Sequence, residues 1–188
     1  MSETVSPLEW GPISLVRRNH GLEHATINLI SKRYPGRSFA GHSDTKGFWI
    51  IGDISTDELA EIVQQALKRM NEGEHGLAIH AHCGTNAVTT GVVAGSVAWL
   101  ATLRSENSLE KKLDRLPWLI VLVTGAVILA QPLGPKVQEK VTTCGVPGNL
   151  AVKQIVRYER SIRGKQMMHR VDTFEKAAEE TPQEPAAE

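Results

Sequence analysis

The spacing of hydrophobic residues near the start of the chain predicts a helix over residues 12–33, which Tyr34-Pro35-Gly36 ends. The apolar residues at helical spacings are Ile13, Val16, Ile27 and Ile30. His20 and His24 fall within the same stripe. An imidazole on an apolar face loses its hydration, so each ring needs a hydrogen bond or a metal ion.

Two β-prone stretches follow at residues 37–42 and 47–54, and the polar residues between them predict a hairpin. Ser55 and Glu58 have the spacing of a capping box, so a second helix is predicted to begin after Ser55. The residues expected on its buried face are Leu59, Ile62, Val63, Ala66 and Met70.

Residues 74–83 are predicted to form a short strand that leads into the next segment. Together with the preceding elements, this strand predicts a small α+β unit with the order α-β-β-α-β over residues 1–83.

Two long stretches in the middle of the chain, at residues 84–103 and 116–135, each contain 20 residues and no charge. A membrane helix needs about 20 apolar residues. The segment between them, 104–115, carries seven charges in 12 residues, as expected of a polar loop. Residues 84–135 therefore predict a two-helix transmembrane hairpin, with a buried hairpin of a soluble protein as the alternative because Thr, Ser, Gly and Gln dilute both stretches.

The chain after the hairpin is basic and then acidic. Residues 136–172 are predicted to form a membrane-proximal region. Within it, residues 150–170 are predicted to form a basic amphipathic helix that lies on anionic lipid, with an ordinary solvated helix as the alternative. Residues 173–188 are rich in Glu, Pro and Ala, and we expect this tail to be disordered.

Charge and cysteine content narrow the classes of function and the location. The 21 Lys and Arg residues balance the 21 Asp and Glu residues, so the chain has no net positive charge to attract nucleic acid. We therefore expect no nucleic-acid partner. Two cysteines are too few for a disulfide framework, and the N-terminal region lacks the apolar core of a signal peptide. We expect an integral protein of the cell (inner) membrane with both termini in the cytoplasm. The four Lys and Arg residues of 104–115 favour the opposite orientation, with this loop in the cytoplasm, by the positive-inside rule.

The stretch "HGLEH" carries the candidate chemistry. His20 and His24 are four residues apart, so both imidazoles project from one helix face. Glu23 stands beside them in the HxxEH order of inverted zincins, in which the glutamate is the general base. The pattern has only three specified positions, and a pair of hydrogen-bonded core histidines is the alternative.

A third zinc ligand is available in "IHAHC", which supplies His80, His82 and Cys83. On a strand, His80 and His82 would face the same side, and Cys83 would lie at the strand end beside the membrane. Cys144 is an additional candidate if both ends of the hairpin lie on one face, but an inert small residue is the more common role for such a cysteine.

These motifs resemble the bacterial YqhQ-type family, integral membrane proteins described as predicted metal-dependent enzymes without an established reaction. His-Gly-x-Glu-His-x-Thr-Ile is similar to residues 20–27, and His-x-x-Cys-Gly-Thr to residues 80–85. A later Gln with a Thr-Thr pair resembles Gln138, Thr142 and Thr143, with a spacing one residue longer. The hairpin of residues 37–54 has no counterpart in the resemblance.

The resemblance implies that the ligand set consists of His20, His24, His80 and Cys83, and it gives His82 less weight. With three of these ligands and an open position, the site predicts a membrane-bound zinc hydrolase of the peptidase class, in which Glu23 activates water. Its substrate would be a peptide or lipid at the bilayer surface, and Asn19 or Asn86 could polarise the substrate carbonyl.

A non-catalytic role is the competing hypothesis. Four protein ligands would close the tetrahedron and make the metal structural. Gly91 and Gly95 form a GxxxG pattern that allows close helix approach, within the hairpin or between protomers. The chain would then be a scaffold or channel-like homo-oligomer in the bilayer.

Overall fold

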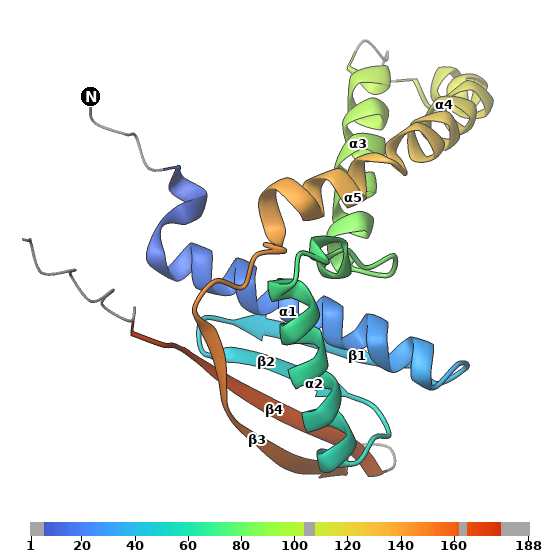
Figure 1. Ribbon diagram of the computed structural model, residues 1–188. Helices are drawn as coiled ribbons and strands as arrows, with labels where there is room; N and C mark the ends of the chain where they lie inside the picture. Colours follow the sequence, from blue (N-terminus) through green and yellow to red (C-terminus); the bar gives the residue numbers. More distant parts are fainter. Residues whose placement is uncertain (1–5, 104–107, 162–164, 178–188) are drawn as a thin grey trace, which may run out of the picture.

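The computed structural model describes residues 6–103, 108–161 and 165–177, and its fold is a mixture of helices and one antiparallel sheet (Figure 1). The elements are a 3₁₀ turn η1 (Pro7–Glu9), α1 (Gly11–Arg33), β1 (Ala40–Asp44), β2 (Gly47–Ile51), α2 (Thr56–Asn71), a 3₁₀ turn η2 (His75–Ala78), α3 (Gly84–Thr102), α4 (Leu109–Ala130), α5 (Leu133–Val137), a π-helical turn η3 (Gln138–Thr142), β3 (Leu150–Ser161) and β4 (Lys165–Glu175).

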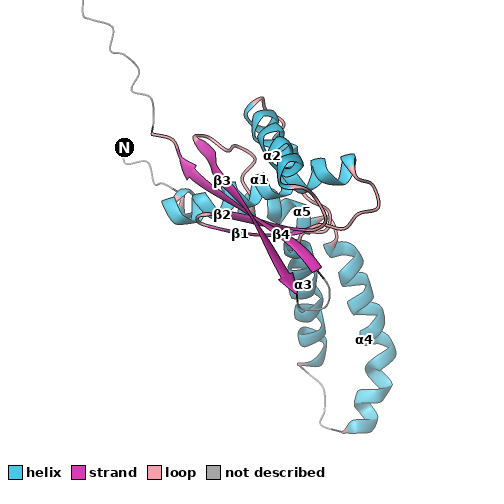
Figure 2. Ribbon diagram, turned by 90° about the horizontal axis from the view of Figure 1, so that it is seen from below, coloured by secondary structure: helices cyan, strands magenta, loops and turns pink. Residues whose placement is uncertain are grey.

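The sheet has the strand order β1-β2-β4-β3, and each neighbouring pair is antiparallel. The two central strands come from distant parts of the sequence: β2 pairs with β4, and Ile50 lies opposite His169. Helices α1 and α2 cover one face of the sheet, and in the view of Figure 2 the strands lie in front of these helices, with the other face turned to the viewer. The α+β unit therefore includes the last strands of the chain.

The core lies between the sheet and these two helices. Phe48 and Ile50 of β2 are fully buried against it. The capping box at Ser55 and Glu58 and the predicted buried face of α2 are confirmed. The predicted stripe of α1 is confirmed only in its second half, because Ile13 is 39% exposed, whereas residues 21–27 are all buried between several elements.

The predicted strand over residues 74–83 is wrong. The segment forms the turn η2 followed by irregular backbone, and it packs on α1. The amide of Asn28 donates hydrogen bonds to the carbonyl oxygens of Leu77 and Ile79, at 2.9 Å each. The Asn28 side chain thus makes the hydrogen bonds to this backbone that a neighbouring strand would have made. Because the segment is not a strand, His80 and His82 do not share a strand face.

The predicted basic helix over residues 150–170 is also wrong, since this region forms β3 and most of β4. Strand β4 fills the position next to β2 and buries His169 and Val171 in the core. These pairings cross more than 100 residues of sequence, so helical periodicity within the segment could not reveal them. Residues 173–175 of the predicted tail belong to β4, and residues 178–188 lie outside the described part of the chain.

Helices α3 and α4 pack side by side and project from the sheet domain (Figures 1 and 2). Residues 109–115 of the predicted polar loop form the start of α4. Within the described residues, α4 alone is long and apolar enough to cross a membrane, over residues 113–130. A helical hairpin is therefore present, but α3 does not meet the same criterion.

Candidate metal centre

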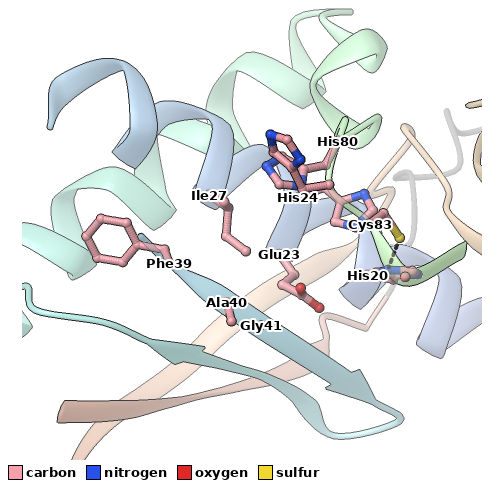
Figure 3. A pocket seen from close by; sticks show the side chains of 11 residues that line it. His20, Glu23, His24, Ile27, Phe39, Ala40, Gly41, His80 and Cys83 are labelled. Atoms are coloured by element: carbon pink, nitrogen blue, oxygen red, sulfur yellow. Dashed lines mark hydrogen bonds between the residues drawn. The ribbon is translucent and has the colours of Figure 1, made fainter. Parts of the chain in front are cut away.

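Helix α1 carries His20, Glu23 and His24 into a cavity between itself, β1 and the segment 80–84 (Figure 3). The cavity has a volume of about 170 Å³, enough for a few water molecules. Glu23 and His24 are buried, and His20 is half-buried. The helical spacing predicted from the sequence thus brings these three side chains together.

Both imidazoles are oriented by backbone carbonyl groups. The Nδ1 atom of His20 lies 2.9 Å from the carbonyl oxygen of Thr142, and Nδ1 of His24 lies 2.8 Å from that of Ala78. A carbonyl oxygen only accepts hydrogen bonds, so Nδ1 carries the proton in each ring. Nε2 is then the atom of each ring that is left to bind a metal ion, as is usual for histidine ligands held by an outer hydrogen bond.

Cys83 joins the two histidines as a third candidate ligand. It caps the N-terminus of α3, and its Sγ lies 3.7 Å from Nε2 of His20. The three ligand atoms of His20, His24 and Cys83 all lie within 4.8 Å of one another. Neighbouring ligands of a tetrahedral zinc ion are about 3.3–3.5 Å apart, so a small inward movement would complete this part of a metal site.

The pKa of Cys83 suits metal binding. Partial burial alone would raise the pKa of Cys83, but hydrogen bonds with His20, His24 and Thr85 lower it to about 5. Burial would lower the pKa of His20, yet the hydrogen bonds to Cys83 and Thr142 raise it overall, so a metal ion would displace the proton that lies between His20 and Cys83. A thiolate is the form of cysteine that binds metals. His20, His24 and Cys83 could therefore hold a metal ion.

Glu23 lies in the same cavity, outside the group of three ligands. Its carboxylate accepts a hydrogen bond from the Ser43 hydroxyl and lies against Gly41, where a Cβ atom would overlap it. Burial raises the pKa of Glu23, and this effect outweighs the hydrogen bond from Ser43 and the charge of His20, which lower it. A carboxyl group with a raised pKa next to a metal site is suited to proton transfer.

His80 lines the cavity without joining the close group. Its ring centre is 5.6 Å from that of His24, and burial lowers its pKa. His82 also lines the cavity, but its side chain is exposed. Of the four ligands that the resemblance implies, the structure brings His20, His24 and Cys83 together and leaves His80 at the wall.

A buried glutamine fixes the segment that carries His80. Gln138 is fully buried; its Oε1 accepts a hydrogen bond from the backbone N–H of His80, and its Nε2 donates to the carbonyl oxygen of the same residue, at 3.0 Å each. Nε2 also donates to Oδ1 of Asn86, at 2.5 Å. Reasoning from residue chemistry did not identify Gln138 or Ser43 as site residues; Gln138 stands out only through the resemblance.

Neither asparagine proposed to polarise a substrate carbonyl is free to do so. The amide of Asn19 donates to the carbonyl oxygen of Asp44 at 2.8 Å, and its oxygen accepts from Thr173 at 2.7 Å. The amide of Asn86 donates to the carbonyl oxygen of Ala81 at 2.7 Å. Both side chains stabilise the fold.

Cys144 contributes its backbone to the site. Its N–H donates to the carbonyl oxygen of Arg17 at 2.9 Å, and its own carbonyl oxygen packs on Gly21. The Cys144 thiol donates to the carbonyl oxygen of Val146 at 3.3 Å and is not in the group of three ligands.

Comparison with known proteins places the chain in a family. No solved structure matches it. The chain is similar to an uncharacterised protein of the cyanobacterium Picosynechococcus sp. (strain ATCC 27264 / PCC 7002 / PR-6), with 33% identity over 153 residues, 74% of this chain and 71% of the relative. The matched names give no metal, reaction or membrane role, and the YqhQ-type resemblance stays an expectation. A family model covers residues 15–155, which include all four candidate ligands and Glu23, and the chain therefore belongs to the family described as Domain of unknown function (DUF6391).

Proposed function

We propose that this protein is a membrane-attached, zinc-dependent hydrolase of the peptidase class, whose general base is Glu23. The observation that carries the proposal is the shared cavity: three candidate metal ligands and a buried carboxylate with a raised pKa line the same small space. Such a combination is a candidate for hydrolysis because the metal and the base act on the same water molecule.

The donor set favours zinc. Two imidazole nitrogens and a thiolate match the ligands of zinc, and a set of three protein ligands leaves a position open for water or substrate. A zinc ion bound there would supply Lewis-acid activation of water. Glu23 would take the proton of that water, and Ser43 would hold the carboxylate in position for the transfer.

The helical hairpin supports attachment to a membrane. None of the residues of α3 is buried, and large apolar side chains are exposed along both helices, including Val88, Trp99, Trp118 and Leu129. Exposure of this much apolar surface to water is unfavourable by about 25 cal/mol per Å². Cys83 directly precedes α3, so the cavity would lie at the bilayer surface. We place the protein in the inner membrane with its termini in the cytoplasm.

A structural metal site in a membrane scaffold is the second candidate function. It is favoured by His80, which lines the cavity and would close the tetrahedron if its ring turned toward His24. Gly91 and Gly95 leave open space on α3, where a second copy could approach closely.

Metal content and hydrolysis together test the proposal. We expect about one zinc per chain in detergent-purified protein by elemental mass spectrometry, and loss of zinc in the His20→Ala/His24→Ala variant. His82→Ala is the matched control, since this histidine lines the same cavity with an exposed side chain. Glu23→Gln should keep zinc and lose hydrolysis. Absence of zinc from the wild-type protein, or unchanged hydrolysis in Glu23→Gln, would contradict the proposal.

A further inference from the structure

The free edge of the sheet next to the candidate metal centre carries an inference about the substrate. Strand β1 is an edge strand that pairs with β2 alone. Its residues Ala40 and Gly41 form one wall of the cavity, and the segment 80–84 contributes to the opposite side. The Glu23 carboxylate points toward β1 (Figure 3), where it lies against Gly41 and accepts a hydrogen bond from Ser43. The edge of the sheet and the candidate catalytic group therefore meet in one place.

The hairpin register shows which backbone groups of β1 are unpaired. Strands β1 and β2 are joined by two residues, 45–46, with Asp44 opposite Gly47. Residues that flank a two-residue turn exchange both hydrogen bonds, and such pairs alternate along an antiparallel ladder. The N–H and C=O groups that point away from β2 are consequently those of Gly41 and Ser43.

These outward groups have no protein partner in the part of the chain that the structure describes. None of the hydrogen bonds there involves the backbone N–H or C=O of Gly41 or Ser43. An edge with alternating unpaired donors and acceptors is a template for another extended chain. The pairing groups recur every two residues, about 6.8 Å apart, as they do along a polypeptide, whereas an acyl chain has no such groups.

We propose that β1 binds an extended polypeptide as an added strand and so presents one of its peptide bonds to the candidate metal centre. This inference rests on the proposed function. The backbone groups of Gly41 and Ser43 would form hydrogen bonds with the substrate backbone. The absence of a side chain at Gly41 leaves room for the Glu23 carboxylate beside the added strand. Because the cavity adjoins the start of α3, the substrate is an unfolded segment at the bilayer surface.

The reaction at this position is hydrolysis, with water as the only co-reactant. The oxygen of water bonds to the carbonyl carbon of the bound peptide, and Glu23 accepts a proton from that water. The C–N bond breaks, and the proton passes from Glu23 to the leaving amine. The second proton of the water follows from the new carboxyl group, and the products are a carboxylate and an ammonium group. A folded substrate would not react, because its backbone groups are already paired and cannot bond to β1.

Residue-resolved amide hydrogen exchange tests the inference. The Glu23→Gln protein, in detergent micelles with one equivalent of zinc, is mixed with a degenerate decapeptide library that is acetylated and amidated. We expect exchange at Gly41 and Ser43 to slow by about tenfold or more at saturating peptide, with no change along β3, the other edge strand. A fully N-methylated library is the matched control: its methyl groups would clash with the edge of β1, and it has no N–H donors for the C=O groups of Gly41 and Ser43, so it should protect neither residue.

Hydrolysis of the same library by the wild-type protein, measured as new amino groups, separates the two claims. Hydrolysis with protection at Gly41 and Ser43 supports both. Hydrolysis without that protection, or equal protection by the N-methylated library, overturns strand addition and leaves the hydrolase. Protection without hydrolysis supports the edge as a polypeptide site and overturns the hydrolase. Neither signal overturns both.

Discussion

Gly21 packs directly against the backbone carbonyl oxygen of Cys144, and a Cβ atom at position 21 would overlap that oxygen. This contact joins α1 to the loop that follows η3, beside the hydrogen bond between His20 and the carbonyl oxygen of Thr142. The glycine in "HGLEH" is thus explained by packing, because only a residue without a side chain lets the helix approach the backbone of Cys144 so closely.

Gly21→Ala should therefore destabilise the protein by about 1–3 kcal/mol, as expected of overpacking in a close contact. The loss should occur although alanine is the better helix former by about 1 kcal/mol. Gly11→Ala in the same helix has open space around it and is the matched control. Denaturant unfolding in detergent measures both; equal stability of the two variants would contradict the packing explanation.

Ser43→Ala tests the positioning of Glu23. The variant removes the hydroxyl that donates to the carboxylate but none of the candidate metal ligands. We expect unchanged zinc content and a fall in kcat of about 10- to 100-fold, the usual effect of losing an outer partner of a metal site. Ser43→Thr, which keeps a hydroxyl, should recover part of the rate. A loss that appears only in KM would point instead to substrate binding at β1.

Gln138→Leu tests the buried amide that holds the His80 segment. It leaves the backbone N–H of His80 without its partner, so we expect a loss of about 1–3 kcal/mol in the free energy of unfolding. Weaker zinc binding should accompany this loss, because the same segment carries Cys83. Glu139→Leu changes an exposed neighbour and is the control. Zinc titration of both variants checks the coupling, and identical affinities would show that Gln138 acts on stability alone.

The acid stability of the protein should depend on Asp44. Hydrogen bonds from Arg170, at 2.8 Å each, are the largest cause that lowers the pKa of this carboxyl group, although its partial burial acts in the opposite direction. A carboxyl group with a folded-state pKa below its unfolded value of about 3.9 stabilises the fold above that value, and its contribution is lost as the pH falls through the folded pKa.

Asp44→Asn should accordingly lower stability at pH 7 by about 1 kcal/mol or less, since the pair is partly exposed, and should reduce the further loss below about pH 4. Asp53→Asn, at an exposed position after β2, is the control. Thermal unfolding between pH 2 and pH 7 measures the difference, because this range includes the unfolded-state pKa of aspartate, about 3.9. A parallel pH dependence for wild type and Asp44→Asn would contradict the assignment.

Leu122→Arg tests the membrane attachment of α4. Leu122 lies within the apolar segment of residues 113–130, and its side chain is exposed. An arginine near the centre of a spanning helix costs about 2.5–3.5 kcal/mol of insertion free energy, so the fraction that resists alkaline extraction from membranes should fall. Gln64→Arg, at an exposed position of α2, should have no effect. Complete extraction of the wild-type protein would contradict a spanning α4.

Local patterns in the sequence were sufficient for several elements. The helix that carries His20, Glu23 and His24, the β1–β2 hairpin and the capped helix α2 are determined by contacts between residues close in sequence, namely helical spacing, turn residues and a capping box. The same spacing placed two imidazoles and a carboxylate on one face. Cys83 was also found, because a cysteine next to histidines is a recognisable ligand type.

Only the tertiary structure decided how these parts meet. The β-structure of residues 150–175 depends on pairing β4 with β2, more than 100 residues away, and the loss of a strand at 74–83 depends on hydrogen bonds from Asn28. The choice of Cys83 over His80, and the roles of Ser43 and Gln138, likewise follow from positions that distant segments impose. Sequence alone determines elements whose energetics are local; a site built where four segments converge is determined by long-range packing, which leaves no periodic signal in the chain.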